Sequence, residues 1–357
     1  MPALPRSFPA SLLLPLLLAA CGAAASPAAS TSPSSRPAAP VASSPAAASA
    51  KPASSAAASP AAGLKPVKVA IPTKGSEFVW LYFGKDAGIF QKHGLDLQIG
   101  IVAAANEAAA LTSGDIDFAA TSLTRAGLNG LPVRNIMFSS NKPGYVVVGA
   151  KGLTSPDQLR GKTLTSDAPD TLGRILLTAF MTNKGIKPNE YKVVTGNSEQ
   201  ARIALVTTGT AQAAIVTVPG ALQLTRQGYP IIGQNADIPS APTSGLGASQ
   251  SFLQAKRDFV IQSLQAGMDS LMTMKANKDE VLPIIEKEFS LDADGAGQVY
   301  DTVRPNITDN GKPNQAAIQF ELSTDQELLQ LKEPPKPEQL FDFSILDQLA
   351  ASGHLTG

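Results

Sequence analysis

Residues 111–122 read LTSGDIDFAATS, and residues 206–217 repeat the same pattern without a gap as VTTGTAQAAIVT. Each stretch combines an apolar helix end, a glycine, a short apolar run typical of a buried strand, and a hydroxyl side chain where the run ends. Two copies of one helix–glycine–strand corner predict two similar α/β lobes. The alternative is a coincidence between two generic corners.

Strands and helices alternate on both sides of these corners. The patterns predict strands over 66–72, 95–99, 117–120, 145–148, 163–165, 191–194 and 213–217, and helices over 77–87, 106–112, from 170 and from 199. Ser76 is predicted to cap the first helix, and the chain after about 250 is mainly helical. Alternation of this kind predicts sheets that are mainly parallel, with ligands bound at the carboxyl ends of the strands.

The composition excludes several classes of function. The 357 residues carry 29 basic and 29 acidic side chains, which leaves no electrostatic footprint for nucleic acid. One Cys and two His exclude an internal disulfide and a Cys-based zinc site, and they make a His-dependent triad improbable. No phosphate-binding glycine loop is found. The sequence therefore predicts no catalytic residue, no metal and no cofactor.

The first 63 residues are not expected to belong to the fold. Residues 1–20 have the charge and apolar run of a signal peptide. They end in LAAC at 18–21, which looks like a bacterial lipobox with Cys21 as the lipidated residue; the alternative is an ordinary Cys inside a leader. Residues 21–63 are mostly Ala, Ser and Pro and predict a disordered tether. The expected location is the outer face of the bacterial cytoplasmic membrane, by a lipid anchor, or the periplasm.

Four blocks resemble a known family. Residues 84–97 (GKDAGIFQKHGLDL), 110–118 (ALTSGDIDF), 157–163 (DQLRGKT) and 246–259 are similar, in this order, to ABC-transporter substrate-binding proteins of the nitrate/sulfonate/taurine and thiamine-precursor-like group. The resemblance covers about 67–330. It implies a two-lobe type II periplasmic-binding-protein fold, α/β in class, with each lobe a mainly parallel sheet flanked by helices and a mostly helical C-terminal region.

The resemblance also implies a division of the chain and a hinge. Residues 64–145 would begin lobe I, 146–239 would form lobe II, and 240–357 would return to lobe I and add the C-terminal helices. The two crossing strands would act as the hinge. Gln212 stands where the family often has Asp, and Trp80 where it has a small residue or proline. A pyrimidine synthase of the thiamine-precursor branch uses a Cys-rich motif, which this chain lacks after Cys21.

Five loops at predicted strand ends form the candidate ligand site. Their residues are Ser76, Phe78, Trp80, Thr121, Ser122, Ser166, Asp170, Thr171, Thr195, Gly196, Asn197 and Thr217. Helix capping is the alternative role of Thr121, Ser122, Asp170 and Thr171. Core packing is the alternative role of the two aromatic residues, Phe78 and Trp80.

Charged residues near these loops leave the ligand open. Lys74 either meets an anion or is solvated, whereas Glu77 and Asp170 favour a ligand with hydrogen-bond donors. Tyr145 belongs to the hinge or to the pocket. The arginines near helix starts are expected to be exposed: Arg125, Arg174 and Arg202.

The predicted function is that of the substrate-binding component of an ABC importer. It would capture a sulfonate-, pyrimidine- or aromatic-carboxylate-like molecule reversibly in a cleft between the lobes, and it would not be an enzyme. Its partners would be a membrane permease with its ATPase, and the protein is expected to be a monomer that binds no nucleic acid. The alternatives are an enzyme of the same fold acting on a small heterocycle, and a ligand sensor with a membrane partner.

Overall fold

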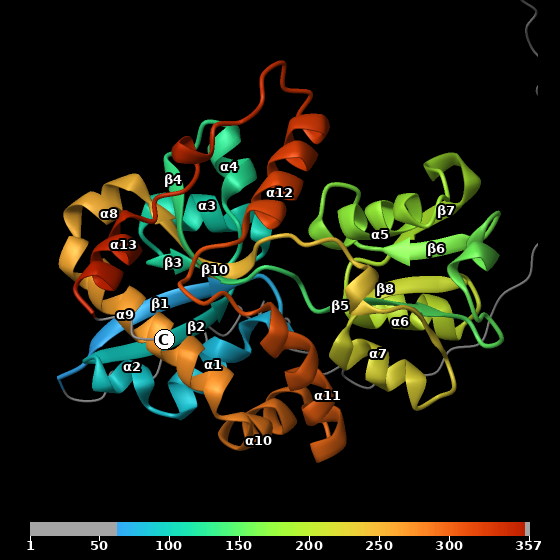
Figure 1. Cartoon of the computed structure of the whole chain (residues 1–357), viewed down its shortest axis with the longest axis horizontal. Helices are drawn as coiled ribbons and strands as arrows, with labels where there is room; N and C mark the ends of the chain where they lie inside the picture. Colours follow the sequence, from blue (N-terminus) through green and yellow to red (C-terminus); the bar gives the residue numbers. More distant parts are fainter. Residues whose placement is uncertain (1–62, 354–357) are drawn as a thin grey trace, which may run out of the picture. The chain divides into compact units, whose positions relative to one another are not determined.

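Two five-stranded sheets organise the part of the chain that the computed structural model describes, residues 63–353. The predicted signal peptide, lipidated Cys21 and most of the predicted tether lie outside these residues. The first sheet has the order β2-β1-β3-β10-β4 (Figure 1). Its strands are β1 (Lys65–Ile71), β2 (Leu95–Ile101), β3 (Phe118–Ala119), β4 (Val133–Ser140) and β10 (Thr243–Ser249).

The second sheet repeats this arrangement with the order β7-β6-β8-β5-β9. Its strands are β5 (Tyr145–Gly149), β6 (Thr163–Ser166), β7 (Lys192–Thr195), β8 (Ala213–Thr217) and β9 (Ile231–Gly233). The repeat predicted from the two sequence corners is confirmed, because β3 and β8 hold the same place in their sheets. The ungapped alignment also pairs Ala104 with Glu199, which are the first residues of helices α3 and α6.

Both sheets are mixed, and one strand in each explains why. The pairs β1–β2, β1–β3, β6–β7 and β6–β8 are parallel, whereas β10 is antiparallel to β3 and β4, and β5 is antiparallel to β8 and β9. Four strands of each sheet therefore run in one direction and a single strand opposes them. The predicted fold class is confirmed, with β5 and β10 as the departure from parallel order.

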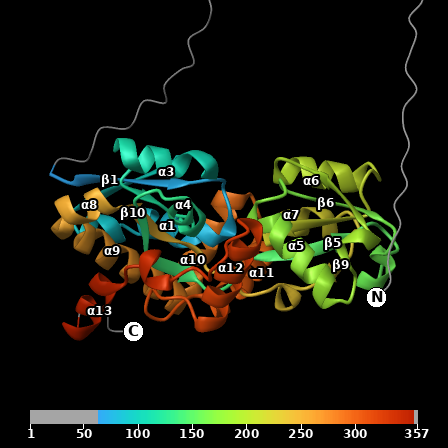
Figure 2. The same ribbon diagram turned by 90° about the horizontal axis from the view of Figure 1, so that it is seen from above.

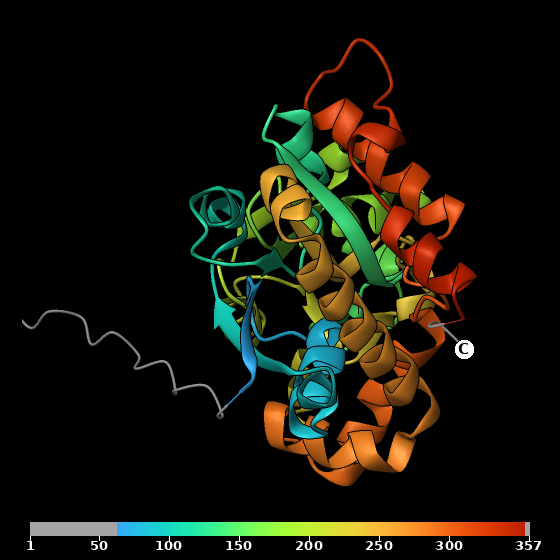
Figure 3. The ribbon, with the colours of Figure 1, turned by 90° about the vertical axis from the view of Figure 1, so that its left-hand side faces the viewer.

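Helices cover both sheets. Figure 2 shows α8, α9 and α13 beside the first sheet and α5, α6 and α7 beside the second, and in Figure 3 the long helix α9 crosses the first sheet. No helix among the described residues is long and apolar enough to cross a membrane. The bounds are α1 (Val79–Asp86), α2 (Ile89–Lys92), α3 (Ala104–Ser113), α4 (Thr124–Leu128), α5 (Leu172–Asn183), α6 (Glu199–Thr207), α7 (Val218–Thr225), α8 (Gln250–Ala255), α9 (Arg257–Ala276), α10 (Lys278–Phe289), α11 (Ala293–Val303), α12 (Gln315–Leu328) and α13 (Ser344–Ala351).

Two local features differ from the sequence expectations. Ser76 does not cap the first helix, because the chain turns helical one residue earlier and Ser76 lies inside a 3₁₀ turn, Ser76–Phe78, whose N-cap is Gly75. Strand β4 was not predicted, because Arg134 and Asn135 interrupt its apolar pattern. The Asn135 amide is nevertheless satisfied: it accepts from the Leu123 N–H at 2.8 Å and donates to the Thr124 hydroxyl at 3.2 Å.

The chain crosses between the sheets twice, and the two crossings are tied together. The first crossing joins β4 to β5, and the second joins β9 to β10. Asn235 on the second crossing donates to the Pro143 carbonyl at 2.7 Å and to the Tyr145 carbonyl at 3.0 Å on the first. Lys142 Nζ donates back to the Ala236 carbonyl at 3.1 Å. These bonds hold the crossings side by side, as the predicted hinge requires.

Gly245 lies on β10 and allows a test of how this strand contributes to stability. Its φ is +155°, and a Cβ there would collide with the Met137 carbonyl on β4. We expect Gly245→Ala to lower the free energy of unfolding by about 2 kcal/mol or more, because both backbone strain and overlap are introduced. The Tm measured by calorimetry should fall by roughly 5 °C. Gly100→Ala on β2 is the matched control, since a Cβ there meets nothing within 4 Å; equal losses in the two variants would contradict the account.

Candidate functional site

The five loops predicted to bind ligand follow β1, β3, β6, β7 and β8 in the structure. All five strands run in the common direction of their own sheet. The loops therefore leave the carboxyl ends of the strands, the edge at which open α/β sheets bind ligands. Ligand contact by the individual residues remains a prediction.

In the first of these loops, the aromatic residues are part of the core. Phe78 and Trp80 are each 1% exposed. The Trp80 indole N–H donates to the hydroxyl of Ser244 on β10 at 2.8 Å, so the indole nitrogen already has a hydrogen-bond partner. The alternative of core packing thus describes both residues in this structure. Ser76 is fully buried, and its hydroxyl has no hydrogen-bond partner in the described part of the chain.

The hydroxyl residues after β3 contact two buried or half-buried carboxylates. Thr121 donates to Glu107 of α3, which is 1% exposed. Ser122 donates to Glu321 of α12 and contacts the Thr124 hydroxyl at 2.9 Å. Helix α12, in the C-terminal region, therefore supplies a carboxyl group to the loop after β3.

The loop after β6 begins with the buried Ser166, which ends the strand, and runs to Thr171 at the start of α5. The Ser166 hydroxyl accepts from Arg174 Nη1 at 3.1 Å. Thr171 occupies the N-cap position of α5, but its hydroxyl donates to the Ala168 carbonyl at 2.8 Å. Asp170 is exposed, and its backbone carbonyl accepts a hydrogen bond from Arg125 of α4. Because α4 follows β3 of the first sheet, this contact links the loop after β6 to a helix of the first sheet.

The loops after β7 and β8 lie around Glu199. Thr195 and Asn197 are exposed. Gly196 is buried against Arg202, and a Cβ at this position would lie 2.6 Å from Arg202 Cγ. The Thr217 hydroxyl caps α7 and donates to Glu199 Oε1 at 2.9 Å, and the Thr217 N–H donates to Oε2 at 2.7 Å. Helix capping is thus one role of Thr217 in this structure.

The expectation that the arginines are exposed is wrong for all three, because Arg202 is buried and Arg125 and Arg174 are half-buried. Arg202 is 4% exposed and donates to Asp167 and, at 3.2 Å, to the Gly196 carbonyl. Arg125 is half-buried and donates to Asp325 from Nε at 3.0 Å and from Nη2 at 2.6 Å. Carboxylates that the sequence does not place nearby pull both guanidinium groups inward.

Glu77, Tyr145 and Glu199 bring the two sheets' loops into electrostatic contact. Glu77 follows β1 and Glu199 begins α6. Burial raises the pKa of Glu77, and the negative charge of Glu199 adds to this shift. Tyr145, at the start of β5, feels both carboxylates, and burial followed by the Glu77 charge raises its pKa. A Cβ on the preceding residue, Gly144, would lie 3.1 Å from the Ser76 hydroxyl. The first crossing therefore passes directly beside the loop after β1.

Burial shifts the titration of three carboxyl groups toward neutral pH. Desolvation raises the pKa of Glu77, Glu107 and Glu321 to about 7 in each case. Glu199 has its pKa raised for the same reason, opposed by the hydrogen bonds from Thr217. Groups with such shifts gather at functional sites more often than elsewhere.

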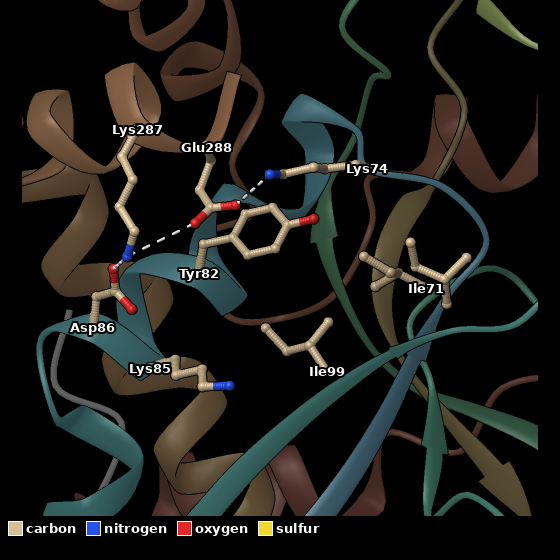
Figure 4. Close-up of a pocket in the computed structure, with 9 residues that line it drawn as sticks. Ile71, Lys74, Tyr82, Lys85, Asp86, Ile99, Lys287 and Glu288 are labelled. Atoms are coloured by element: carbon tan, nitrogen blue, oxygen red, sulfur yellow. Dashed lines mark hydrogen bonds and ion pairs between the residues drawn. The ribbon is translucent and has the colours of Figure 1, made fainter. Parts of the chain in front are cut away.

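A separate cavity of about 380 Å³ lies between α1, α10 and the ends of β1 and β2 (Figure 4). Lys74 lines it and pairs with Glu288 at 2.8 Å, while Lys287 pairs with Asp86 at 2.6 Å. Lys74 is therefore neutralised by α10 and does not face the loops at the strand ends as a free cation.

Sequence reasoning missed most of the charged residues at these loops. Glu107 carried a usable signal, because it is the only charge in the apolar helix 104–113. Glu321 and Asp325 carried none, since their partners lie about 200 positions away. No group of three His, Cys, Asp or Glu side chains within residues 63–353 is placed to hold a metal ion.

Comparisons with known proteins agree with this architecture. The profile of the family described as NMT1/THI5 like matches residues 76–281. Among solved structures, the periplasmic aliphatic sulphonate binding protein SsuA from Escherichia coli is 15% identical, with a TM-score of 0.65 over 80% of this chain and 99% of that one. The ligand binding component of an ABC-type import system from Staphylococcus aureus is 17% identical, with a TM-score of 0.65 over 80% and 98%. The nitrate-binding protein NrtA from Synechocystis is 13% identical, with a TM-score of 0.60 over 82% and 91%.

These likenesses establish the fold as that of periplasmic binding proteins. A search of curated protein sequences found no significant match.

Glu107 offers a test through the pH dependence of stability. The pKa of the Glu107 carboxyl is about 7 in the folded chain and 4.5 in the unfolded chain. The free energy of unfolding therefore falls as the pH rises through this window. Glu107→Gln keeps an acceptor for Thr121 without a charge and should reduce the loss of stability between pH 5 and pH 8 by about 1–3 kcal/mol.

Chemical denaturation at the two pH values measures this effect. Glu327→Gln, an exposed position on α12, should keep the wild-type pH dependence. An unchanged pH dependence in the Glu107 variant would show that this carboxyl group is not protonated in the folded chain.

Proposed function

The chain belongs to the NMT1/THI5-like family, and from this premise we propose that it is the substrate-binding component of an ABC importer. It captures a small organic molecule reversibly between two lobes and hands it unchanged to a membrane permease driven by an ATPase. The ligand classes that we propose are sulfonate-like, pyrimidine-like and aromatic-carboxylate-like molecules. Similar solved structures support this assignment: two are named as sulphonate- or nitrate-binding proteins, and one as the ligand binding component of an ABC-type import system.

One observation carries the proposal: two sheets of identical strand order are joined by two tied crossings. Their strand-end loops come together at Glu77, Tyr145 and Glu199. Two lobes that share a double connection can close over a ligand as a hinge. We propose 64–145 and 240–357 as lobe I and 146–239 as lobe II. We further propose that the protein acts as a monomer and as a binding protein rather than as an enzyme, since capture by closure needs no catalytic residue.

The residues proposed to face the ligand are those at the strand ends that keep some exposure. They are Thr121, Ser122, Asp170, Thr171, Thr195, Asn197 and Thr217. Ser76, Ser166 and Gly196 are buried at the same loops, and Phe78 and Trp80 anchor the first loop in the core.

A thermal-shift panel on the full chain in detergent tests the function. It covers sulfonates, nitrate-like anions, pyrimidines and aromatic carboxylates. A true ligand at 100 times its Kd should add about 2.7 kcal/mol to stability and raise the Tm by roughly 5 °C or more. Mass spectrometry should recover the ligand unchanged. A ligand consumed in the assay would favour the enzyme of the same fold instead.

The lipid anchor is a separate proposal. We propose that the lipidated Cys21 holds the mature protein on the outer face of the cytoplasmic membrane, because LAAC at 18–21 ends the leader at the only cysteine. Cys21→Ser should move the protein from the membrane fraction to the soluble fraction, as measured by fractionation and immunoblotting. Retention of the variant on the membrane would contradict the anchor and leave the binding function untouched.

A further inference from the structure

Within residues 63–353, four glutamates at the strand-end loops form no salt bridge, and among them Glu321 alone has an arginine, Arg125, close enough to act on its charge. Glu107 is 1% exposed, and the other three are half-buried: Glu77, Glu199 and Glu321. A buried carboxylate without a counter-charge is costly, and folded proteins usually pair or protonate it. Such groups at one edge of the two sheets therefore call for an explanation.

Two of the arginines near these glutamates are paired with aspartates: Arg202 with Asp167, and Arg125 with Asp325. The buried Nε of Arg202 has no hydrogen-bond partner in the described part of the chain. Arg174 has no carboxylate partner among the described residues, but its Nη1 donates to Ser166. A sulfonate or nitrate entering here would meet more unpaired negative charge than positive charge, which costs binding energy.

Glu77 and Glu199 are the pair best placed to hold a ligand. Both oxygens of Glu199 are oriented by Thr217, and a Cβ on Gly220 would lie 2.6 Å from Glu199 Cδ, so this carboxylate is fixed against the start of α7. Glu77 interacts with its own backbone N–H, and no other residue of the described part donates to its carboxylate. Each carboxylate oxygen has two lone pairs, so both side chains can accept further hydrogen bonds.

A buried hydroxyl beside Glu77, and a buried carboxylate oxygen at the loop after β3, point independently to a polar ligand. The Ser76 hydroxyl is fully buried next to Glu77, has no partner in the described part, and faces the backbone of Gly144 just before Tyr145. One oxygen of Glu107, which is 99% buried, also lacks a partner there. Native proteins satisfy nearly all such atoms. Of the unpartnered buried side-chain atoms in the described part, all but Arg202 Nε can accept a hydrogen bond, which matches a ligand rich in N–H donors.

We infer that the strand-end loops select a small organic cation with N–H donors, such as a protonated amine or amidine, and reject oxyanions. The inference rests on the proposed function and names the ligand chemistry of the same site. Glu77, beside the first sheet, and Glu199, beside the second, accept hydrogen bonds from the cation. The positive charge of the ligand neutralises these carboxylates, which no arginine does.

Two probes of matched shape and opposite charge test the inference. Calorimetric titration of the full chain in detergent at pH 8 compares benzamidinium with benzenesulfonate. We expect benzamidinium to bind and benzenesulfonate to fail. Glu77→Gln and Glu199→Gln should each weaken benzamidinium binding at least tenfold, because each removes one negative charge. Glu280→Gln, at an exposed position on α10, is the control and should bind as the wild type does.

The remaining outcomes separate the inference from the function beneath it. Glu77→Asp keeps the charge and should retain more binding than Glu77→Gln, which distinguishes charge recognition from a folding defect. Benzenesulfonate binding that Arg174→Gln abolishes would overturn the inference and leave the importer function standing. Failure of benzamidinium to bind also overturns it. Failure of both probes and of the whole ligand panel would count against the proposed function itself.

Discussion

The two crossings between the sheets are the constraint on which the rest of the structure depends. Each crossing forces one strand, β5 or β10, to run against the other four strands of its sheet. Those four then share a direction, so β1, β3, β6, β7 and β8 deliver their following loops at the carboxyl edges of the two sheets. Asn235 bonds the crossings to each other, and Ser76 and Glu77 lie beside the first of them. Topology alone thus gathers the polar residues that the function needs.

Electrostatics gives this edge its chemical character. Asp167 and Asp325 neutralise the nearby arginines, while Glu77 and Glu199 stay without a counter-charge in the described part of the chain. Burial raises the pKa of Glu77 to about 7, so the proton and a cationic ligand would compete for the same carboxylate near neutral pH. The similar solved structures whose names mention sulfonate or nitrate share the fold at 13–15% identity. A common fold with a different charge pattern can serve a different ligand.

Local patterns in the sequence were enough to predict the doubled α/β architecture. The corner at 111–122 and its repeat at 206–217 determine helix end, glycine and strand in both sheets. The same alignment pairs Glu107 with Arg202, and both are buried, yet local sequence predicts neither partner. The contact of Arg202 with Asp167 depends on the pairing of β6 with β7. The contact of Ser122 with Glu321 depends on the packing of α12 beside the loop after β3. Long-range packing therefore decides the charges of the site, whereas short-range patterning decides its scaffold.

Closure of the two lobes over a ligand is the central claim, and a distance between them tests it most directly. The variant carries Cys21→Ser together with Asn129→Cys after α4 and Lys187→Cys before β7, and a fluorescent label is attached to each new cysteine. Both labelled positions are exposed. Energy transfer between them should rise when a ligand that stabilises the chain is added, because the lobes approach each other around the crossings. Binding without any change in transfer would show that the ligand is not captured by closure, and would contradict this account.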